Sequence, residues 1–382
     1  MKKFLLISQS QDGSYVNLIK NALSKSGYSL TVFTGKFSDV EKDVEIVEAP
    51  KYDSTSFKSR FKTWFSYVRS AKKYLKSNID KFDAVMFTSN PPVNQSLVKF
   101  AQSKKKKCIY LIWDIYPDCI EKSFGKKVAP ITAVWRSINR KMYEKCDQVL
   151  TIGEVMREHI LQSYPKLDVK VIPYHTDTGY IHPIDKDENI FVKQNELEGK
   201  KVFMYSGKMG LGHGFDEMLN VAELLKDRDD IRFLFIGHGM AFEPVKKHIE
   251  DNGLSNTKIL TFQPLKMLPY SLGSADVSFI TIREQTDGLF LPSKVYDAMA
   301  SGSAIICISG GKNDVSKLME DNEIGVHVKT SSVDELKAAV LKLADDEEFL
   351  ERCKKNAVGL AVRDYDIKTV TEQYRRLFDS MI

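Results

Sequence analysis

A glycine-rich stretch in the second half of the chain has the composition of a phosphate-binding loop. Residues 205–214 (YSGKMGLGHG) contain four glycines and Lys208. Glycines let a backbone approach a ligand closely, and the helix expected to follow offers free N–H groups and a positive dipole end. Gly207, Lys208 and Gly210 are therefore candidate ligands of a diphosphate. A tight strand–helix turn whose glycines serve packing alone would give the same pattern, and without a following G-K-[ST] this is not a Walker loop.

A second stretch, residues 292–302 (PSKVYDAMASG), combines a cation and a carboxylate at the start of a predicted helix. Pro292 suits the first helical turn, where Ser293 and Lys294 would lie among outward-pointing N–H groups. Asp297, three residues after Lys294, shares its helix face. A lysine that meets phosphate and a carboxylate that accepts from ribose hydroxyls would bind a nucleotide sugar. The alternative is a surface Lys–Asp pair.

The sequence gives little sign of metal chemistry. Residues 227–229 (DRD) and 364–366 (DYD) match the D-x-D pattern of metal-dependent transferases, but the first precedes a predicted strand and the second the last helix, so turn or cap roles are favoured. The seven histidines show no ligand spacing. The five cysteines are scattered and never form a C-x-x-C pair, which argues against a disulfide framework or zinc site and favours a reducing cytoplasm.

Strands and helices must alternate along the chain to position these stretches. Predicted strands cover residues 3–8, 29–34, 83–88, 108–113, 148–152, 201–206, 232–237, 258–262, 277–281 and 304–308, with helical periodicity between them. Such alternation predicts an α/β fold with parallel sheets. The 382 residues suit two domains, and residues 174–200 read as a linker. We therefore expect domains at 1–175 and 176–365, with a last helix at 366–382 packing back on the first.

In these stretches the sequence resembles the family-4 glycosyltransferases of the GT-B fold, particularly those of bacterial surface-polysaccharide assembly. Six segments match in order: 82–92 (FDAVMFTSNPP), 111–118 (LIWDIYPD), 151–157 (TIGEVMR), 170–177 (KVIPYHTD), 205–214 and 292–302. Residues 235–239 (FIGHG) also resemble the family's GxG turn, which adds Gly239 to the donor side. The resemblance implies two Rossmann-like domains facing a cleft.

The resemblance further implies a UDP-sugar donor on the second domain, an acceptor on the first, and retention at the anomeric carbon. The family's phosphate-binding Arg and Lys fall on Lys208 and His213, and its ribose-binding acid on Asp297. The usual Gly-Gly after the first strand is reduced to Asp12-Gly13-Ser14, so Gly13 and Ser14 are assigned to the acceptor side. The first acid of the family's E-x7-E pair would fall on Leu289, with Glu284 and Asp287 close by.

As a mechanism we expect Lys294, Lys208 and the amide groups of residues 207–210 to stabilise the leaving diphosphate, without a metal cofactor. Asp114, at the end of a first-domain strand, could orient the acceptor hydroxyl or take its proton, or could instead cap a turn before Pro117. Asp118 is a weaker candidate for the acceptor side. His213 could contact phosphate when protonated, or could be a neutral loop histidine.

Residues 57–76 form a predicted helix with seven basic residues and no acid. Phe57, Phe61, Trp64, Phe65, Val68 and Leu75 are expected on one broad face of it. Basic residues beside an aromatic face suit an anionic membrane, where a lipid-linked acceptor would lie. A core-facing helix with a solvated basic edge is the alternative. Nucleic acid is disfavoured, because 56 basic and 51 acidic residues nearly balance and no recognition motif is present.

The leading hypothesis is thus a cytoplasmic enzyme, with peripheral attachment to the inner membrane face as an option, that transfers a sugar from a nucleotide sugar to a lipid-linked or cell-surface glycan in polysaccharide biosynthesis. A nucleotide-sugar epimerase of the same fold and a non-catalytic sugar-nucleotide-binding protein remain alternatives. No stretch of 18 apolar residues exists that would span a bilayer.

Overall fold

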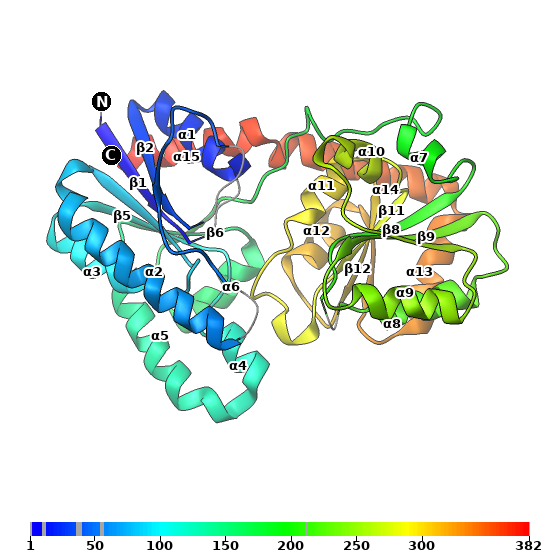
Figure 1. Ribbon diagram of the computed structural model, residues 1–382, viewed down its shortest axis with the longest axis horizontal. Helices are drawn as coiled ribbons and strands as arrows, with labels where there is room; N and C mark the ends of the chain where they lie inside the picture. Colours follow the sequence, from blue (N-terminus) through cyan, green and yellow to red (C-terminus); the bar gives the residue numbers. More distant parts are fainter. Residues whose placement is uncertain (1, 10–12, 36–39, 54–56, 211–212, 382) are drawn as a thin grey trace. The chain divides into compact units, whose positions relative to one another are not determined.

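The computed structural model describes residues 2–9, 13–35, 40–53, 57–210 and 213–381, which form two compact units (Figure 1). Unit 1 comprises Met1–Pro173, Gly288–Leu291 and Ile367–Ile382, and unit 2 comprises Tyr174–Asp287 and Pro292–Asp366. The first junction lies two residues before the one predicted at 175. Assignment of Gly288–Leu291 to unit 1 was not foreseen from the sequence.

Unit 1 is built on a parallel seven-stranded sheet of order β3-β2-β1-β4-β5-β6-β7. Its strands are β1 (Lys2–Ile7), β2 (Tyr28–Thr34), β3 (Glu45–Glu48), β4 (Ala84–Thr88), β5 (Lys107–Ile112), β6 (Gln148–Thr151) and β7 (Val169–Val171). Every residue of β4 and β6 is buried, as expected for parallel strands covered on both faces.

Seven α-helices accompany this sheet in the described part of unit 1. They are α1 (Gly13–Lys25), α2 (Phe57–Asn78), α3 (Gln95–Ser103), α4 (Asp118–Phe124), α5 (Ala129–Tyr143), α6 (Glu154–Ser163) and α15 (Ile367–Met381). The last helix packs on α1: the Tyr15 hydroxyl donates to the Tyr374 hydroxyl over 3.1 Å, and the rings of Phe4 and Phe378 lie 5.2 Å apart (Figure 1). The C-terminal end of the chain therefore completes the N-terminal unit.

Helix α2 does not present the aromatic face expected from the sequence. Trp64 and Leu75 are buried together with Tyr67, whose hydroxyl donates to the carbonyl of Phe33, whereas Phe65 is 62% exposed. The expected single face was wrong, because some of its residues, such as Trp64, lie in the core and others, such as Phe65, lie in solvent. The side chain of Phe57 lies outside the described residues. The lysines and Arg69 of α2 are exposed, whereas Arg60 is half-buried. Contact of residues 57–76 with an anionic membrane stays a prediction.

Unit 2 contains a parallel six-stranded sheet of order β10-β9-β8-β11-β12-β13. Its strands are β8 (Lys201–Lys208), β9 (Ile231–His238), β10 (Thr257–Leu260), β11 (Val277–Thr281), β12 (Ala304–Ser309) and β13 (Gly325–Lys329). Strand order reverses between β8 and β11, which is the Rossmann arrangement, and ligands of such sheets bind at the carboxyl ends of the strands at this reversal. The predicted α/β class is confirmed, with β3, β7 and β13 in addition to the strands predicted.

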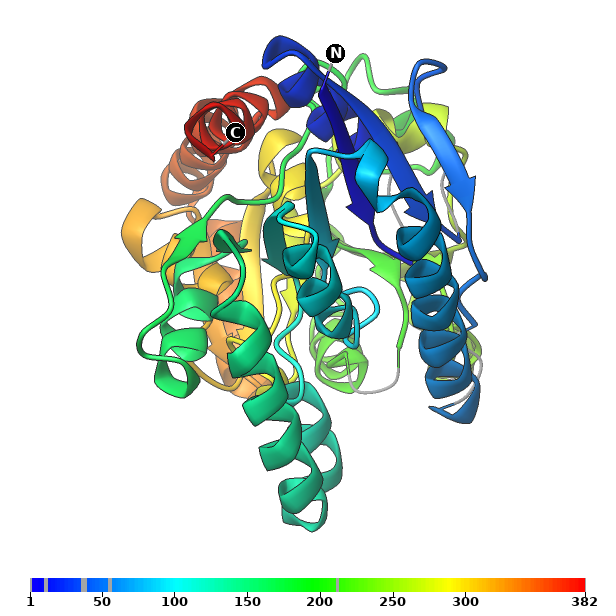
Figure 2. The same ribbon diagram turned by 90° about the vertical axis from the view of Figure 1, so that its left-hand side faces the viewer.

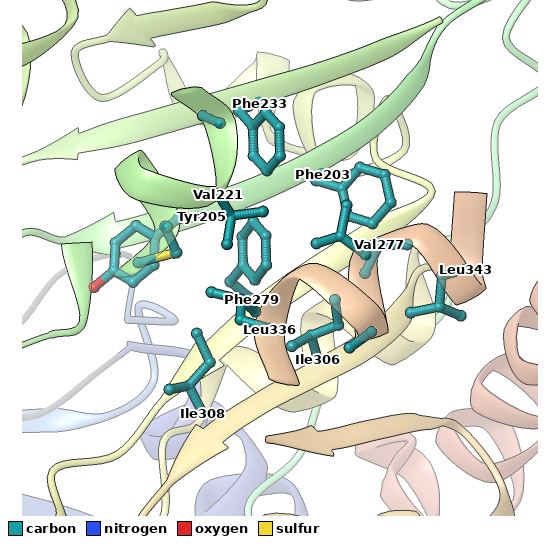
Figure 3. Packing of buried hydrophobic residues seen from close by; sticks show 14 of the residues in the cluster. Phe203, Tyr205, Val221, Phe233, Val277, Phe279, Ile306, Ile308, Leu336 and Leu343 are labelled. Atoms are coloured by element: carbon teal, nitrogen blue, oxygen red, sulfur yellow. The ribbon is translucent and has the colours of Figure 1, made fainter. Parts of the chain in front are cut away.

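Helices pack on both faces of the second sheet. They are α7 (Ile190–Gln194), α8 (Phe215–Leu224), α9 (Phe242–Asp251), α10 (Leu268–Leu272), α11 (Lys294–Ala300), α12 (Asp314–Asn322), α13 (Val333–Asp345) and α14 (Glu347–Leu360). Phe203, Phe233 and Phe279 of three adjacent strands stack in the core, with ring centroids 5.9 to 6.4 Å apart (Figure 3). Tyr205 adjoins this cluster but turns its hydroxyl away from it (Figure 3).

Candidate functional site

The loops after β8 and β9 pack backbone against backbone at the sheet reversal. The amide of Met209 donates to the carbonyl of His238 over 2.9 Å, and Ala241 donates to the carbonyl of Met209 over 3.1 Å. A Cβ at Gly239 (φ +147°) would lie 2.3 Å from the Met209 oxygen, and one at Gly237 would lie 2.0 Å from the Gly207 oxygen. Only glycine fits at 237 and 239, so the predicted GxG turn holds the β8 loop in place.

Lys294, the first residue of α11, lies across the end of β8. Its ammonium nitrogen is 3.7 Å from the centroid of the Tyr205 ring, and a Cβ at Gly207 would contact its Cδ at 3.7 Å. The side chain is partly buried, and burial lowers its pKa from 10.5 to about 7. Among the described residues no carboxylate forms an ion pair with it. The aromatic face compensates only part of the cost of placing this cation here.

Two further cations converge on His213 from neighbouring segments. Burial, together with the positive charges of Lys294, Arg283 and Lys208, lowers the pKa of His213 from 6.5 to about 4. The Tyr205 hydroxyl donates to the Lys208 carbonyl and lies 2.8 Å from His213 Nδ1, which assigns the Nδ1–H tautomer to the imidazole. His213 is therefore a neutral loop histidine in the unliganded protein. It lies in the positive field of Lys208 at the end of β8 and of Arg283 and Lys294 in the segment from β11 to α11.

Arg283 was missed by the sequence analysis. It follows β11 by two residues, at the same carboxyl edge of the sheet as Lys208, and its side chain is exposed. Its position after a predicted strand was the available signal, since carboxyl ends of adjacent parallel strands meet at one edge.

The remaining donor-side candidates have intramolecular contacts. Ser293 is the exposed N-cap residue of α11. The Asp297 carboxylate accepts from the Thr176 hydroxyl over 2.7 Å, so its assignment to a ribose stays a prediction. Gly210 lies beside His213, because a Cβ there would be 3.0 Å from Nε2. Leu211 and Gly212 of the predicted loop lie outside the described residues.

The position of the family's first acid is occupied by an apolar residue of the other unit. Leu289 is fully buried, and its carbonyl accepts from the amide of Ile115 over 2.9 Å. Nearby in the sequence, burial raises the pKa of Asp287 to about 6, and Asn313 donates to its carboxylate over 3.2 Å. Asp287 is thus held by the N-cap residue of α12.

Asp114 lies in unit 1 directly beyond β5, bridged to Phe290. Its amide donates to the Ser89 hydroxyl oxygen over 3.2 Å, but its carboxylate accepts no hydrogen bond from the described residues. No hydrogen bond of the Asp114 carboxylate in the described structure therefore supports the alternative that Asp114 caps a turn. Burial raises the pKa of Asp114 to about 6.

Asp118, by contrast, is committed to a structural ion pair. Its carboxylate lies 3.1 Å from Arg136 and 3.7 Å from His159. Burial acts to raise the pKa of Asp118, but His159 and Arg136 outweigh it and hold the pKa below its ordinary value. Gly13 and Ser14 begin α1, Gly13 buried and Ser14 exposed, while Asp12 lies outside the described residues.

A pocket of about 620 Å³ adjoins the β8 loop at the start of α8. It is lined by Gly214, Arg283 and Glu284 together with residues of α8 and α9, but not by Lys294. Within the described ranges, no group of three or more His, Cys, Asp or Glu side chains could hold a metal ion. Of the two D-x-D stretches, Asp230 beside the first pairs with Arg228, and Asp366 of the second accepts from Thr178.

Both halves of the chain match family models of known enzymes. Residues 13–180 match "Glycosyltransferase Family 4" and residues 186–359 match "Glycosyl transferases group 1". "Probable glycosyltransferase WbjE" of Pseudomonas aeruginosa is 24% identical over 257 residues, 66% of this chain and 63% of that protein. "Putative colanic acid biosynthesis glycosyl transferase WcaI" of Escherichia coli K12 is 25% identical over 223 residues, 57% of this chain and 54% of that protein.

The chain thus spans less than two thirds of the length of each of these two relatives. Among solved structures, Alr3699/HepE of Anabaena in complex with UDP superposes with a TM-score of 0.75 and 14% identity, covering all of both chains. That likeness concerns the fold. The chain belongs to the group 1, family 4 glycosyltransferases, a retaining family, and has the GT-B fold with its two parallel α/β sheets.

Proposed function

We propose that the chain transfers a sugar from a UDP-sugar whose diphosphate lies at the carboxyl ends of β8 and β11. Lys294 carries the proposal: it is a partly buried ammonium group with no described carboxylate partner, and it lies at the reversal of strand order. A cation in such a place costs free energy unless an anion compensates it. Lys208 and Arg283 extend the same positive field, as their effect on His213 indicates. The solved structure of HepE with UDP supports the choice of nucleotide.

In the transfer, the bond between the anomeric carbon and the β-phosphate oxygen breaks, and a bond from the acceptor hydroxyl oxygen to that carbon forms. Negative charge develops on the departing UDP. Lys294, Lys208, Arg283 and the amide groups of residues 207–210 stabilise that charge, and this assignment includes no metal ion. One such preorganised donor typically contributes roughly 3–4 kcal/mol. Turnover that persists unchanged in excess EDTA is the expected result.

On the acceptor side, we assign Asp114 to orient the acceptor hydroxyl or accept its proton. Its carboxylate is unbonded within the described structure, and a pKa of about 6 leaves it ionised at pH 7.5. The acceptor in this proposal is a lipid-linked or cell-surface glycan of a polysaccharide pathway, as the colanic acid assignment of WcaI suggests. The described cysteines are all free thiols, which suits a reducing cytoplasmic compartment.

Thermal shifts with UDP, GDP and TDP, and with sugars linked to each, test the donor assignment. UDP compounds should raise the melting temperature most, because a ligand that binds only the folded state stabilises it. A larger shift with GDP would refute the base assignment, and no shift with any nucleotide would refute the function. Donor recovered after incubation is then analysed by NMR: an unchanged sugar with release of UDP supports transfer or hydrolysis, whereas an inverted carbon would indicate an epimerase.

A further inference from the structure

Helix α5 of unit 1 differs from an ordinary surface helix because it buries polar side chains beside aromatic ones and exposes several apolar side chains. Its buried residues are Thr132, Asn139 and Tyr143, and the first two make hydrogen bonds, Thr132 to Glu121 over 2.7 Å and Asn139 to the carbonyl of Tyr116 over 2.9 Å. The helix therefore faces its own unit with two bonded polar groups and with the rings of Trp135 and Tyr143. Surface helices normally expose polar residues and bury apolar ones, so the residues on the solvent face of α5 indicate whether this surface has another role.

The solvent face of α5 and the end of α4 carry an apolar stripe. Ile131, Val134 and Ile138, spaced three and four residues apart on α5, are 69%, 62% and 46% exposed, and Phe124 at the end of α4 is 47% exposed. Four of the twelve markedly exposed large apolar side chains among the described residues thus fall within 15 positions. Scattered exposed apolar residues are ordinary, but a contiguous run on one helix face indicates an interaction surface.

The same segment is strongly basic. Residues 122–143 contain six Lys or Arg and no Asp or Glu. The side chains of Lys122, Lys127 and Lys141 are exposed and, within the described structure, make no ion pair. Among the described helices none is long and apolar enough to cross a bilayer. An apolar stripe flanked by cations on a helix that does not span is the pattern of a helix lying in the interface of an anionic membrane.

We propose that α4 and α5, together with η2 (Gly125–Val128), form a docking surface for an anionic lipid bilayer. In Figures 1 and 2 this pair of helices projects from the rest of unit 1. A second copy of the chain is a poorer occupant, because residues 122–143 of the two copies, with six Lys or Arg and no acid in each, would bring like charges together. Helix α2 is the poorer apolar anchor, since Trp64 and Tyr67 are buried and only Phe65 among its described aromatic side chains is markedly exposed.

The surface connects with the acceptor side of the proposed reaction. Trp135 of α5 stacks on Tyr116, with ring centroids 6.3 Å apart, and Tyr116 follows Asp114 by two residues. The rings of Trp64 and Tyr116 meet edge to face, with centroids 5.9 Å apart. A lipid-linked acceptor entering at the docking surface would therefore meet aromatic rings before it reached Asp114. This connection rests on the proposed function, whereas the docking surface itself does not require it.

Vesicle flotation with the full chain tests the proposal. Vesicles of phosphatidylcholine with 30% phosphatidylglycerol should carry the protein, and vesicles of phosphatidylcholine alone should not. The double variant Ile131→Gln/Val134→Gln should lower partitioning about tenfold or more, since each side chain buries apolar surface in the interface. Removal of two charges in Arg140→Ala/Lys141→Ala should lower it about thirtyfold at low salt.

Matched controls locate the effect. Leu224→Gln/Val362→Gln removes comparably exposed apolar side chains from unit 2, and Lys72→Ala/Lys73→Ala removes two charges from α2. Both should leave partitioning within threefold of wild type. The proposal fails if wild type ignores the anionic vesicles, if the α2 variant loses as much as the α5 variants, or if light scattering reveals a dimer that Ile131→Gln/Val134→Gln dissolves. UDP binding in solution, measured on the same preparations, reports separately on the proposed function.

Discussion

The substitution Lys294→Met should weaken nucleotide binding and at the same time stabilise the unliganded protein. Methionine keeps the length of the side chain and its contact with Tyr205 but removes the charge. A pKa near 7 in place of 10.5 corresponds to about 5 kcal/mol of free energy against the charged form. Partial solvent exposure and loss of the cation–π contact reduce the net gain to roughly 2 kcal/mol. We expect the melting temperature to rise by a few degrees.

The dependence of this gain on pH follows from the lowered pKa of Lys294. Below pH 7 the lysine is charged in both the folded and the unfolded chain, so the full penalty is present. Between pH 7 and 10.5 the unfolded chain binds the additional proton, and the penalty disappears as pH rises. The stabilisation by Lys294→Met should therefore be largest at or below pH 7 and shrink toward pH 10.

Calorimetric titration with UDP and differential scanning fluorimetry, both at pH 7.5, measure the two effects. The dissociation constant of UDP and the turnover number should each worsen by about a hundredfold, the value of one preorganised charge in a desolvated site. Lys247→Met, on an exposed lysine of α9, should alter neither quantity. UDP affinity within threefold of wild type, or a lower melting temperature, would refute the assignment of Lys294 as the diphosphate cation.

Three further outcomes are expected. UDP affinity of the wild type should fall up to tenfold per pH unit above pH 7, because binding then requires proton uptake by Lys294. Calorimetry in buffers of different ionisation enthalpy would detect that proton. A UDP affinity that does not change with pH would contradict this prediction. Gly237→Ala should cost about 3 kcal/mol in urea unfolding, since its Cβ would lie 2.0 Å from a backbone oxygen, whereas Gly359→Ala, with open space around it, should be neutral or stabilising. Asp114→Asn should cut sugar transfer at least a hundredfold while UDP affinity stays unchanged; equal loss of both would refute an acceptor-side role.

Periodicity predicted the fold well because buried parallel strands are near-continuous apolar runs. Strands such as β4 and β12 are buried at every residue and are visible in the sequence for that reason. The three unpredicted strands lack that signal: no residue of β3 is buried, β7 has three residues, and β13 begins at a glycine. Such strands form because they pair with an adjacent strand of the sheet. The local sequence pattern does not show which strand that partner is.

The candidate site was predictable where chemistry coincides with a strand end. Lys294 was identified because a lysine after Pro292 must begin a helix at the carboxyl edge of a sheet. Arg283 was missed because a single arginine in a short irregular segment has no periodic context. The exposed apolar residues of α5 were also not foreseen, since Thr132 and Asn139 become interior residues only through hydrogen bonds to groups elsewhere in unit 1.

The short segment Gly288–Leu291 has a consequence for anyone who wishes to recombine these enzymes. The junction after Pro173 is the obvious place to exchange the donor and acceptor halves of related transferases. The segment Gly288–Leu291, however, lies in the second half of the sequence and belongs to unit 1 through its contacts with Ile115 and Asp114. A hybrid gene joined at a single point would place a foreign four-residue segment against that loop. Hybrids should carry 288–291 and the final helix 367–381 from the same parent as residues 1–173. A working chimera therefore needs four junctions between the two parental sequences.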